Sequence, residues 1–189
     1  MKLFKKLVGE NIYLSPQVVD EEIIEKFTKW LNDFKVTDYI GKSASIITIE
    51  GERKWFENKD TNKDHIFFIV RAEDDEVIGS VGLHSIDYIN KTATFGIFIG
   101  EQYGRNKGYG TEALRLILDY GFNYLNLNSI KLDVMEFNDR AIACYKKCGF
   151  KEYGRRRKSE FINGKYYDTI EMDILAEEFQ EDFIKNKNQ

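Results

Sequence analysis

The chain has 189 residues, of which 42% are hydrophobic, and this length and composition suit one domain with a substantial core. Its formal net charge of −4 argues against general nucleic-acid binding and mildly favours a cationic substrate. The sequence has two cysteines and no Cys/His cluster, so no metal site is expected. Because it shows no signal peptide, long apolar span or lipidation motif, we expect a soluble cytoplasmic protein without membrane contact.

Three elements are predicted in the first third of the chain. Alternating apolar and polar residues predict a first strand over 11–15. Apolar residues at helical spacing predict a helix over 20–34 with Asp20 as its N-cap, and a second helix is expected over 49–58 after an irregular segment at 37–47. The aromatic residues of these helices belong either to the core or to a substrate pocket: Trp30, Trp55 and Phe56.

The next segment is predicted to form three consecutive strands. Apolar and β-branched residues occupy 65–71, 77–88 and 92–99, separated by short polar turns, which indicates an antiparallel meander. Gly79 and Gly82 lie inside the middle strand and predict a bulge or a close backbone approach there.

A helical crossover is predicted after the meander. An apolar stripe predicts a helix from about Thr111, and the alternating segment 129–137 predicts a strand parallel to 92–99, because such crossovers join parallel strands. A second helix is expected over 139–148, where Gly149 is placed to cap its C-terminus.

A hairpin is predicted near the end of the sequence. Residues 150–161 indicate a strand interrupted at Gly154, the dipeptide at 163–164 (Asn-Gly) is a hairpin turn signal, and 165–175 returns as the last strand. The tail after residue 183 is rich in Lys and Asn, and we expect it to be frayed.

The segment 97–111 predicts an anion site. An alternating strand ends there, a basic turn with Arg105 and Lys107 follows, and a helix begins near Thr111. The free N–H groups and the dipole of a helix N-terminus attract anions. Glycines let the backbone approach such a ligand closely, and the turn contains three: Gly104, Gly108 and Gly110. Strand, turn and helix together indicate a pyrophosphate site.

Two known phosphate-binding turns do not fit this spacing. A P-loop would place Ser or Thr directly after Gly-Lys, whereas Gly-Tyr-Gly follows Lys107. A dinucleotide-binding turn would have the order G-x-G-x-x-G, whereas residues 104–110 read G-x-x-x-G-x-G. The sequence therefore excludes both.

Two motifs resemble those of the GNAT N-acetyltransferases. Residues 105–110 (Arg-Asn-Lys-Gly-Tyr-Gly) resemble the R/Q-x-x-G-x-G/A acyl-CoA signature of that family, and residues 138–150 match its second signature, N-x-x-A-x-x-x-Y-x-K-x-G-F. The resemblance extends over about 64–175. The segment 161–168 looks like the branch that contains ribosomal-protein alanine and spermidine N-acetyltransferases.

The resemblance implies an α/β (α+β) GNAT fold. Its mixed, mostly antiparallel sheet would have about seven strands with splayed central strands, flanked by about four helices. A single domain over 1–189 would divide into an acceptor-side part (1–63), an acetyl-CoA-binding core (64–175) and a tail (176–189). A homodimer is also expected, because dimers are common among the proteins that it resembles.

The resemblance also implies contacts with acetyl-CoA as the cosubstrate. A bulge in the strand before the turn would open the splay and leave N–H groups as an oxyanion hole. Asn138 would contact the pantetheine arm, Ala141 would leave room for it, and Lys147 would reach a phosphate. Main-chain groups would bind the pantetheine arm at Phe98, Ile99 and Gly100, and the pyrophosphate at Arg105, Asn106, Lys107, Gly108, Tyr109, Gly110 and Thr111.

Chemistry assigns the catalytic candidates. Tyr145 can donate a proton to the departing thiolate, and the other interpretation is that it only packs at a helix–sheet junction. The attacking amine must be neutral, so a base is expected; several relatives have a glutamate where Thr94 aligns. Glu136 is a candidate base or water holder, or else a solvated glutamate at a strand end, and His84 and Asp87 are weaker candidates.

We therefore predict an N-acetyltransferase that transfers the acetyl group of acetyl-CoA directly to a primary amine in a ternary complex. The amine could belong to a protein N-terminus, a polyamine or another small molecule. Cys144 and Cys148 have no evident triad partner and are expected to be buried thiols rather than nucleophiles. The basic run at 155–158 is either an exposed strand face or a phosphate contact. The alternative function is a non-catalytic acyl-CoA-binding or regulatory module.

Overall fold

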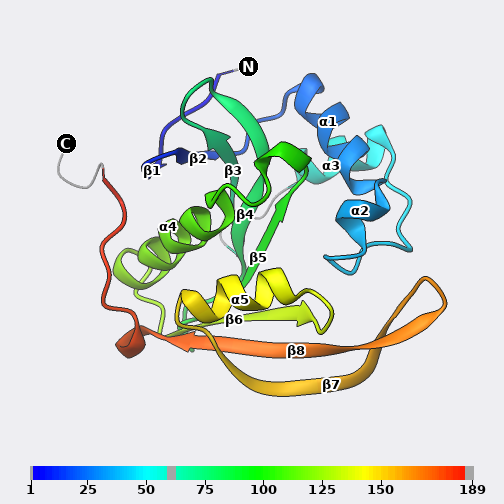
Figure 1. Cartoon of the computed structure of the whole chain (residues 1–189). Helices are drawn as coiled ribbons and strands as arrows, with labels where there is room; N and C mark the ends of the chain where they lie inside the picture. Colours follow the sequence, from blue (N-terminus) through cyan, green and yellow to red (C-terminus); the bar gives the residue numbers. More distant parts are fainter. Residues whose placement is uncertain (1, 59–62, 186–189) are drawn as a thin grey trace.

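The computed structural model describes residues 2–58 and 63–185. Within these ranges, eight strands form one sheet in the order β1-β2-β3-β4-β5-β6-β8-β7, and five α-helices pack around it (Figure 1). All neighbouring strands are antiparallel except β5 and β6, which are parallel. The predicted mixed, mostly antiparallel sheet is therefore confirmed.

The strands are β1 (Leu7–Val8), β2 (Ile12–Pro16), β3 (His65–Arg71), β4 (Glu76–Asp87), β5 (Thr92–Ile99), β6 (Ser129–Met135), β7 (Lys151–Ile162) and β8 (Lys165–Leu175). The α-helices are α1 (Glu21–Leu31), α2 (Phe34–Thr37), α3 (Ile49–Glu57), α4 (Tyr109–Asn123) and α5 (Asp139–Lys147), and the 3₁₀ helices are η1 (Gln102–Gly104) and η2 (Ala176–Glu178). Among the strands and α-helices, two short elements were not predicted. They are β1, which makes the eighth strand, and α2, which begins before the segment that was expected to be irregular.

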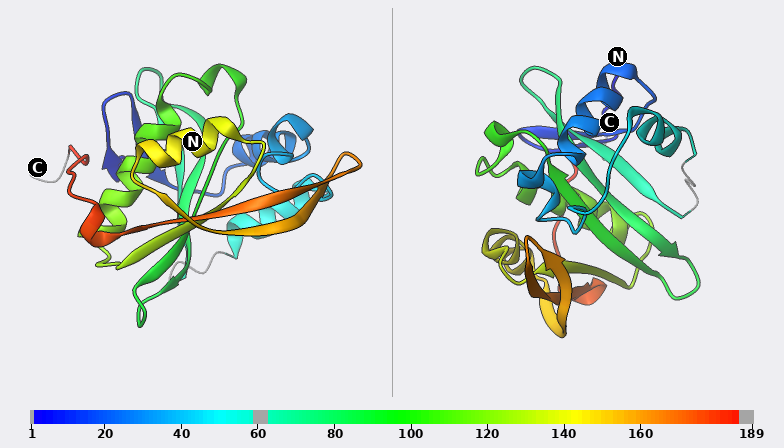
Figure 2. Two further views of the ribbon diagram at one scale, coloured as in Figure 1. Left: turned by 60° about the horizontal axis from the view of Figure 1, so that its bottom comes forward. Right: turned by 90° about the vertical axis from the view of Figure 1, so that its right-hand side faces the viewer.

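The helices α1 and α3 cover one face of the sheet (Figure 2). Asp20 caps α1 as predicted, because its side chain accepts a hydrogen bond from Ile23 N at 3.3 Å. Phe27 of α1 packs with Phe56 of α3 and with Phe68 of β3 at ring-centroid distances of 5.3 and 5.6 Å. Trp30 is buried in the same cluster, whereas Trp55 is 43% exposed. Two of the three aromatic residues left open by the sequence therefore belong to the core.

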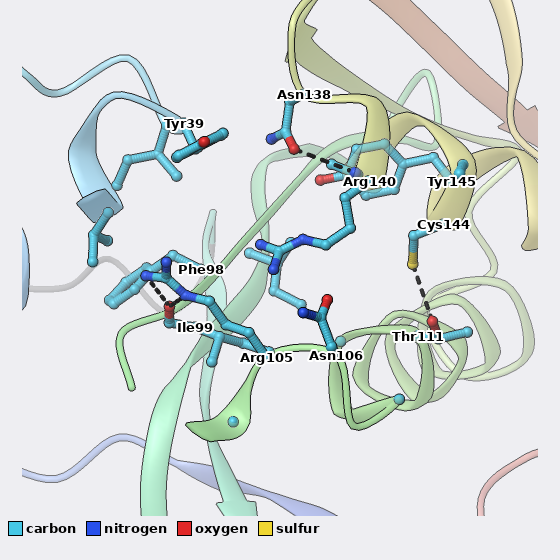
Figure 3. A pocket seen from close by; sticks show the side chains of 18 of the residues that line it. Tyr39, Phe98, Ile99, Arg105, Asn106, Thr111, Asn138, Arg140, Cys144 and Tyr145 are labelled. Carbon is cyan, nitrogen blue, oxygen red and sulfur yellow. Dashed lines mark hydrogen bonds between the residues drawn. The ribbon is translucent and has the colours of Figure 1, made fainter. Parts of the chain in front are cut away.

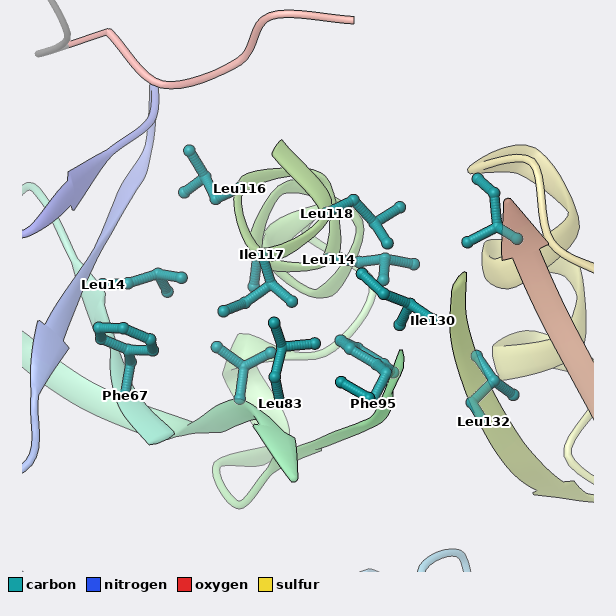
Figure 4. Close-up of a cluster of buried hydrophobic side chains, with 14 of the residues drawn as sticks. Leu14, Phe67, Leu83, Phe95, Leu114, Leu116, Ile117, Leu118, Ile130 and Leu132 are labelled. Atoms are coloured by element: carbon teal, nitrogen blue, oxygen red, sulfur yellow. The ribbon is translucent and has the colours of Figure 1, made fainter. Parts of the chain in front are cut away.

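The opposite face carries the larger core, which is centred on α4 (Figure 4). Leu114 and Ile117 are fully buried and point toward the sheet, where they meet Leu83 of β4 and Phe95 of β5. Side chains alternate between the two faces of a strand, so one face of each central strand belongs to this cluster and the other to the cluster of α1 and α3. Packing on this face fixes the N-terminus of α4 beside the end of β5.

The central strands β5 and β6 diverge. They pair only at Thr92↔Ser129, Ala93↔Ile130 and Thr94↔Lys131, after which β6 continues along β8 and β5 along β4. The predicted splay of the central strands is therefore confirmed. Beyond these three pairs, the edge of β5 opposite β4 is not paired with β6.

The bulges lie in β4 and not in β5. The register of β4 shifts against β3 next to Val70 and against β5 between His84 and Asp87, which confirms the predicted irregularity of the middle strand. The register of β5 on β4 is continuous from Thr94 to Ile99, so the expected bulge in the strand before the basic turn is wrong. The splay arises instead because β6 follows β8 away from β5.

The β7–β8 hairpin extends beyond the rest of the sheet (Figures 1 and 2). Asn163 and Gly164 have φ angles of 47° and 78°, and two positive φ angles are what a two-residue hairpin turn requires. The strand β7 is not interrupted at Gly154, which pairs with Glu171 across a register shift. A bulge accommodates this glycine without ending the strand.

The C-terminal segment is held against the domain as far as Lys185. The carboxylate of buried Asp119 in α4 accepts hydrogen bonds from Phe183 N at 2.6 Å and Ile184 N at 2.9 Å. Lys185 N donates to Val8 O at 2.9 Å, and Ile184 is buried. The prediction that the tail is frayed is wrong for 184–185, and the remaining residues 186–189 lie outside the described residues.

Candidate active site

A cavity of about 370 Å³ lies where β5 and β6 diverge, between the N-termini of α4 and α5 and the helix α2 (Figure 3). Eleven of the fourteen residues predicted to bind the cofactor line it. They are Phe98, Ile99, Arg105, Asn106, Gly108, Gly110, Thr111, Asn138, Ala141, Tyr145 and Lys147. The two sequence motifs therefore come together at one concave site.

The other three predicted residues lie outside this cavity. Lys107 and Tyr109 line a separate, polar depression on the other side of the turn, together with Arg71 and Tyr103. Gly100 donates its N–H to Ile78 O at 3.0 Å. A Cβ atom at Gly100 would overlap the ring of Trp30, so this glycine is required for packing against α1.

The N-terminus of α4 opens into the cavity. The helix begins at Tyr109, two residues before the predicted start, and its N-cap Gly108 has a left-handed φ of 86° that suits glycine. No side chain caps this end, so the first N–H groups of α4 remain available to a ligand. Uncapped amides and the helix dipole make this end of the cavity an anion site.

Main-chain groups of β5 line the splay. Because Gly100 N bonds to β4, and hydrogen-bonding directions alternate along an antiparallel strand, the amides of Ile97 and Ile99 point toward β6. Beyond Thr94, β5 has no ladder pairs with β6. Arg105 donates to Ile99 O at 3.2 and 3.1 Å, which leaves the N–H of Ile99 and both main-chain groups of Ile97 facing the cavity. The sequence analysis named Ile99 but missed Ile97.

Positive charge dominates the cavity wall. Among the described residues, no carboxylate lines it. Four cationic side chains do: Lys35, Arg105, Arg140 and Lys147. Burial lowers the pKa of Arg105, and the nearby charge of Arg140 lowers it further. Two guanidinium groups that repel each other in a cavity are stabilised by a bound anion. The cavity therefore suits a ligand with several negative charges.

Arg140 was missed because it occupies a variable position of the second motif. It shares one face of α5 with Cys144 and Lys147, which lie four and seven residues further on. All three line the cavity, and Figure 3 shows the side chain of Arg140 crossing its centre. This spacing was the signal in the sequence that could have identified it.

Tyr145 points from α5 into the cavity (Figure 3). Its ring packs against Phe95 and Phe150 at centroid distances of 5.9 and 6.0 Å, and burial raises the pKa of its hydroxyl. In 2–58 and 63–185 no protein group forms a hydrogen bond with this hydroxyl. The phenol is thus held by its ring and stays protonated, with its hydroxyl available to a ligand.

Asn138 fixes the start of α5. Its Oδ1 accepts a hydrogen bond from Ala141 N at 3.3 Å, and its side chain is buried at the cavity wall. This cap orients the first turn of α5, so that Arg140 and Tyr145 project into the same space.

The predicted base Glu136 does not line the cavity. Its carboxylate accepts a hydrogen bond from Asp168 N at 2.9 Å and forms an ion pair with Arg155 at 3.3 Å, so it connects β6 to the β7–β8 hairpin. The basic run at 155–158 is exposed, and Arg156 pairs with Asp133 and Glu171. This agrees with the interpretation of the run as an exposed strand face.

The two weaker candidates for the base, Asp87 and His84, have different surroundings. The carboxylate of Asp87 is used in the following turn, where it accepts hydrogen bonds from Ile89 N and Asn90 N. His84 lies directly opposite Thr94 in the β4–β5 ladder and beside Gly96, so its imidazole projects from the same face of the sheet as Thr94. Burial lowers the pKa of His84, against a smaller opposing effect of Asp64, which favours the neutral imidazole.

The fold and the cavity define a class of protein, an acyltransferase with a splayed sheet and an anion-binding helix N-terminus. The family model for the acetyltransferase (GNAT) domain matches residues 14–151, and the chain belongs to this family. The predicted class, an acetyl-CoA-dependent N-acetyltransferase, is thereby confirmed at the level of the family.

Named relatives are similar over different lengths. The chain is 33% identical over 161 residues to the spermidine N(1)-acetyltransferase of Escherichia coli (78% of this chain, 83% of that protein). It is 33% identical over 175 residues to the probable N-acetyltransferase YjcK of Bacillus subtilis (89% and 96%). A match to the spermidine N(1)-acetyltransferase of Vibrio cholerae is 38% identical over 112 residues and spans 59% of this chain and 64% of that protein.

Solved structures agree with the fold. The crystal structure of spermidine N-acetyltransferase from Vibrio cholerae in complex with CoA and spermine matches with a TM-score of 0.78 and 28% identity, covering 87% of this chain and 96% of that one. The predicted branch is therefore confirmed along with the fold. No helix in the described part of the chain is long and apolar enough to span a membrane.

Proposed function

We propose that this protein transfers the acetyl group of acetyl-CoA to a primary amine by direct attack within a ternary complex. One observation carries the proposal. A single cavity contains an uncapped helix N-terminus, main-chain groups left free by the splay of β5 and β6, and the protonated phenol of Tyr145. These are the groups needed to hold a diphosphate, polarise a thioester carbonyl and protonate a thiolate.

Different residues of the chain would bind different parts of the cofactor. The amides at Gly108–Thr111 and the side chains of Arg140 and Lys147 would bind the phosphates. The main-chain groups of Ile97 and Ile99 would continue the β5 ladder along the pantetheine arm and bring the acetyl group toward Tyr145. Main-chain recognition of this kind requires no particular side chain on β5.

Tyr145 would act as the general acid. A free thiol has a pKa of about 8.5, so a thiolate leaving group takes a proton from a phenol only when the two are held together. Burial raises the pKa of Tyr145, which keeps the phenol protonated until the thiolate forms beside it. The N–H groups of β5 would stabilise the negative charge on the carbonyl oxygen in the same step.

The proton of the attacking amine needs an acceptor. Glu136 stays a prediction, but its carboxylate is already bound to the hairpin. We favour His84, because it faces Thr94 across the ladder and its lowered pKa keeps it neutral. His84 does not line the cavity, so it would act through a water molecule.

The acceptor would enter on the side of α2. Lys35, Val36, Tyr39 and Ile40 line that end of the cavity, which the sequence analysis assigned to the acceptor. Spermidine is the acceptor in the names of the relatives above. None of the described residues that line the cavity is a carboxylate that could pair with a polycation, so a protein N-terminus or another monoamine is an equally suitable acceptor.

Release of free CoA tests the proposal. Purified protein is incubated with acetyl-CoA and, separately, with spermidine, spermine, glucosamine and a peptide that has a free N-terminus. Amine-dependent thiol release with formation of the acetylated amine is expected for at least one class. Tight CoA binding in a calorimeter without turnover on any amine would instead favour the non-catalytic acyl-CoA-binding module, which the missing glutamate at Thr94 motivates.

Two further properties belong to this proposal. We place the protein in the cytoplasm, because two free cysteines suit a reducing compartment. A homodimer and the absence of nucleic-acid binding also stay predictions. Light scattering at several protein concentrations and a gel-shift assay with duplex DNA and RNA would test them.

A further inference from the structure

The two cysteines lie together on α5, and one of them reaches the cavity. Cys144 lines the cavity, and its Sγ lies 3.2 Å from Thr111 Oγ1 in the first turn of α4 (Figure 3). Cys148 follows four residues later at the C-cap of α5, one helical turn from Cys144, and its backbone N–H donates to Cys144 O at 3.2 Å. Both side chains are half-buried rather than enclosed in the core.

The groups around Cys144 favour its thiolate. The neighbouring thiol of Cys148 lowers the pKa of Cys144, and the Thr111 hydroxyl and the charges of Lys147 and Arg115 act in the same direction against burial. The uncapped N-terminus of α4 adds partial positive charge on the same side. The pKa of Cys148 is raised by the neighbouring Cys144 and by burial, so Cys148 is the thiol that keeps its proton.

We propose that Cys144 is a site of covalent modification by peroxides and soft electrophiles, with Cys148 as its resolving thiol, and that its oxidation blocks the cofactor cavity. The thiolate of Cys144 attacks one oxygen of hydrogen peroxide, the O–O bond breaks, and hydroxide leaves, which gives a sulfenic acid. The thiol of Cys148 then attacks that sulfur, an S–S bond forms, and water leaves. Peroxide is the oxidant, and the two thiols supply both electrons.

The geometry allows this bond. Residues one helical turn apart have Cα atoms about 6 Å apart, within the range of disulfides. Their Cβ atoms are about 5–6 Å apart, so the last turn of α5 must close by about 1 Å for the bond to form. Cys148 is the C-cap of α5, with φ −92° and ψ 9°, so the helix backbone beyond it need not distort. A reducing agent would reverse the reaction.

Oxidation would affect the cavity in two ways. The sulfenic acid places an additional oxygen where Cys144 meets Thr111, and the disulfide pulls the last turn of α5 next to Tyr145 and Lys147. A displacement of about 1 Å at a catalytic group costs about 10²-fold in rate. This consequence rests on the proposed function, whereas the thiol chemistry itself does not.

Peptide mapping tests the chemistry directly. Trypsin cleaves after Arg140, Lys146, Lys147 and Lys151, so the two cysteines lie in different peptides, 141–146 and 148–151. After mild hydrogen peroxide the two peptides should be joined, with the loss of two hydrogen atoms, and dithiothreitol should separate them. In Cys148→Ser, dimedone should label Cys144. In Cys144→Ser, Cys148 should stay unmodified at the same dose.

Iodoacetamide and CoA complete the test. Cys144 should alkylate at least about tenfold faster than Cys148 at pH 7, and saturating CoA should slow this reaction. Peptides that remain unlinked after peroxide, or equal alkylation of both cysteines, would overturn the proposal. If calorimetry shows CoA binding but CoA gives no protection, blockage of the cavity is wrong. If CoA does not bind at all, the proposed function fails, while the linkage of the two peptides still decides the thiol chemistry.

Discussion

The cofactor side and the acceptor side of this protein are built differently. Around the N-terminus of α4 the ligand-facing groups are mostly main-chain amides, positioned by Gly108 and by the splay of β5 and β6. On the side of α2 the cavity is lined by the side chains of Lys35, Val36, Tyr39 and Ile40. Main-chain recognition can tolerate many sequences around a few glycines, whereas side-chain recognition changes with each substitution.

This difference explains why the structure indicates the class of reaction but not the identity of the acceptor amine. Amides at a helix end can bind a diphosphate, and amides on an open strand edge can bind a pantetheine arm, without any particular side chains. The proposed acceptor end instead depends on side chains such as that of Tyr39, whose ring is held 5.7 Å from the ring of Phe137, a residue from a distant part of the chain. The experiments below test each side, beginning with the largest expected effect.

The largest effect is expected for Tyr145→Phe. Loss of the phenol proton should lower kcat by about 10² to 10⁴ while CoA affinity, measured by calorimetry, stays within about twofold. The phenylalanine ring keeps the contacts with Phe95 and Phe150, so folding should not change. Tyr39→Phe removes the other cavity phenol and serves as the control. Unchanged kcat in Tyr145→Phe would show that Tyr145 only packs.

A smaller effect is expected for the proton acceptor. His84→Gln should lower kcat/KM by about 10- to 10²-fold at neutral pH. Because its pKa is lowered, His84 is neutral and basic down to a pH below 6.5, so the acidic limb of the wild-type pH profile should lie below that value.

Glu136→Gln is the matched comparison. It should change kcat/KM by less than about threefold, because the ion pair that it removes is partly exposed and holds the hairpin. If Glu136→Gln removes activity and His84→Gln does not, Glu136 is the base. The pH profiles of kcat/KM for both variants decide between them.

Gly108→Val tests the helix N-terminus. At φ 86° a β-branched residue is strained, although nothing lies within 4 Å of its Cβ, so CoA should bind about tenfold more weakly. Gly164→Val carries similar backbone strain at φ 78° and is also free of contacts, but it lies in the hairpin turn. Calorimetry should show weaker CoA binding only for Gly108→Val. Equal CoA affinity in both variants would contradict the placement of the phosphates.

Much of the fold could be predicted from local patterns. Three features depend on residues that are close in the sequence, and a local pattern therefore predicted each of them. They are the hairpin turn at Asn163–Gly164, the N-cap Asp20 and the meander. The two-residue strand β1 has too short a pattern to detect and exists only because Leu7 and Val8 pair with β2. The docked tail could not be predicted either, since its partner Asp119 lies 64 residues away from Phe183 in the chain.

In the candidate site, too, local features could be predicted and contacts between distant residues could not. Both motifs were recognisable because the spacing of their glycines, Asn138 and Tyr145 is local. The environment of Glu136 could not be predicted, because Arg155 and Asp168 come from strands that pair with β6 only in the folded sheet. Arg140 is a different case, because its helical spacing from Cys144 and Lys147 is local and was visible in the sequence, although its position in the motif is variable.

Arg140→Gln is expected to have the smallest effect. Arg140 is exposed at the cavity wall, and water and salt weaken its attraction for phosphates, so CoA affinity should fall by about two- to fivefold. The loss should shrink as salt rises, because the attraction is electrostatic. Lys146→Gln removes one positive charge from the same helix at a residue that does not line the cavity, and it should leave affinity unchanged. If both variants lose affinity equally, the overall charge of α5 attracts the cofactor, and the main-chain groups alone determine where its phosphates bind.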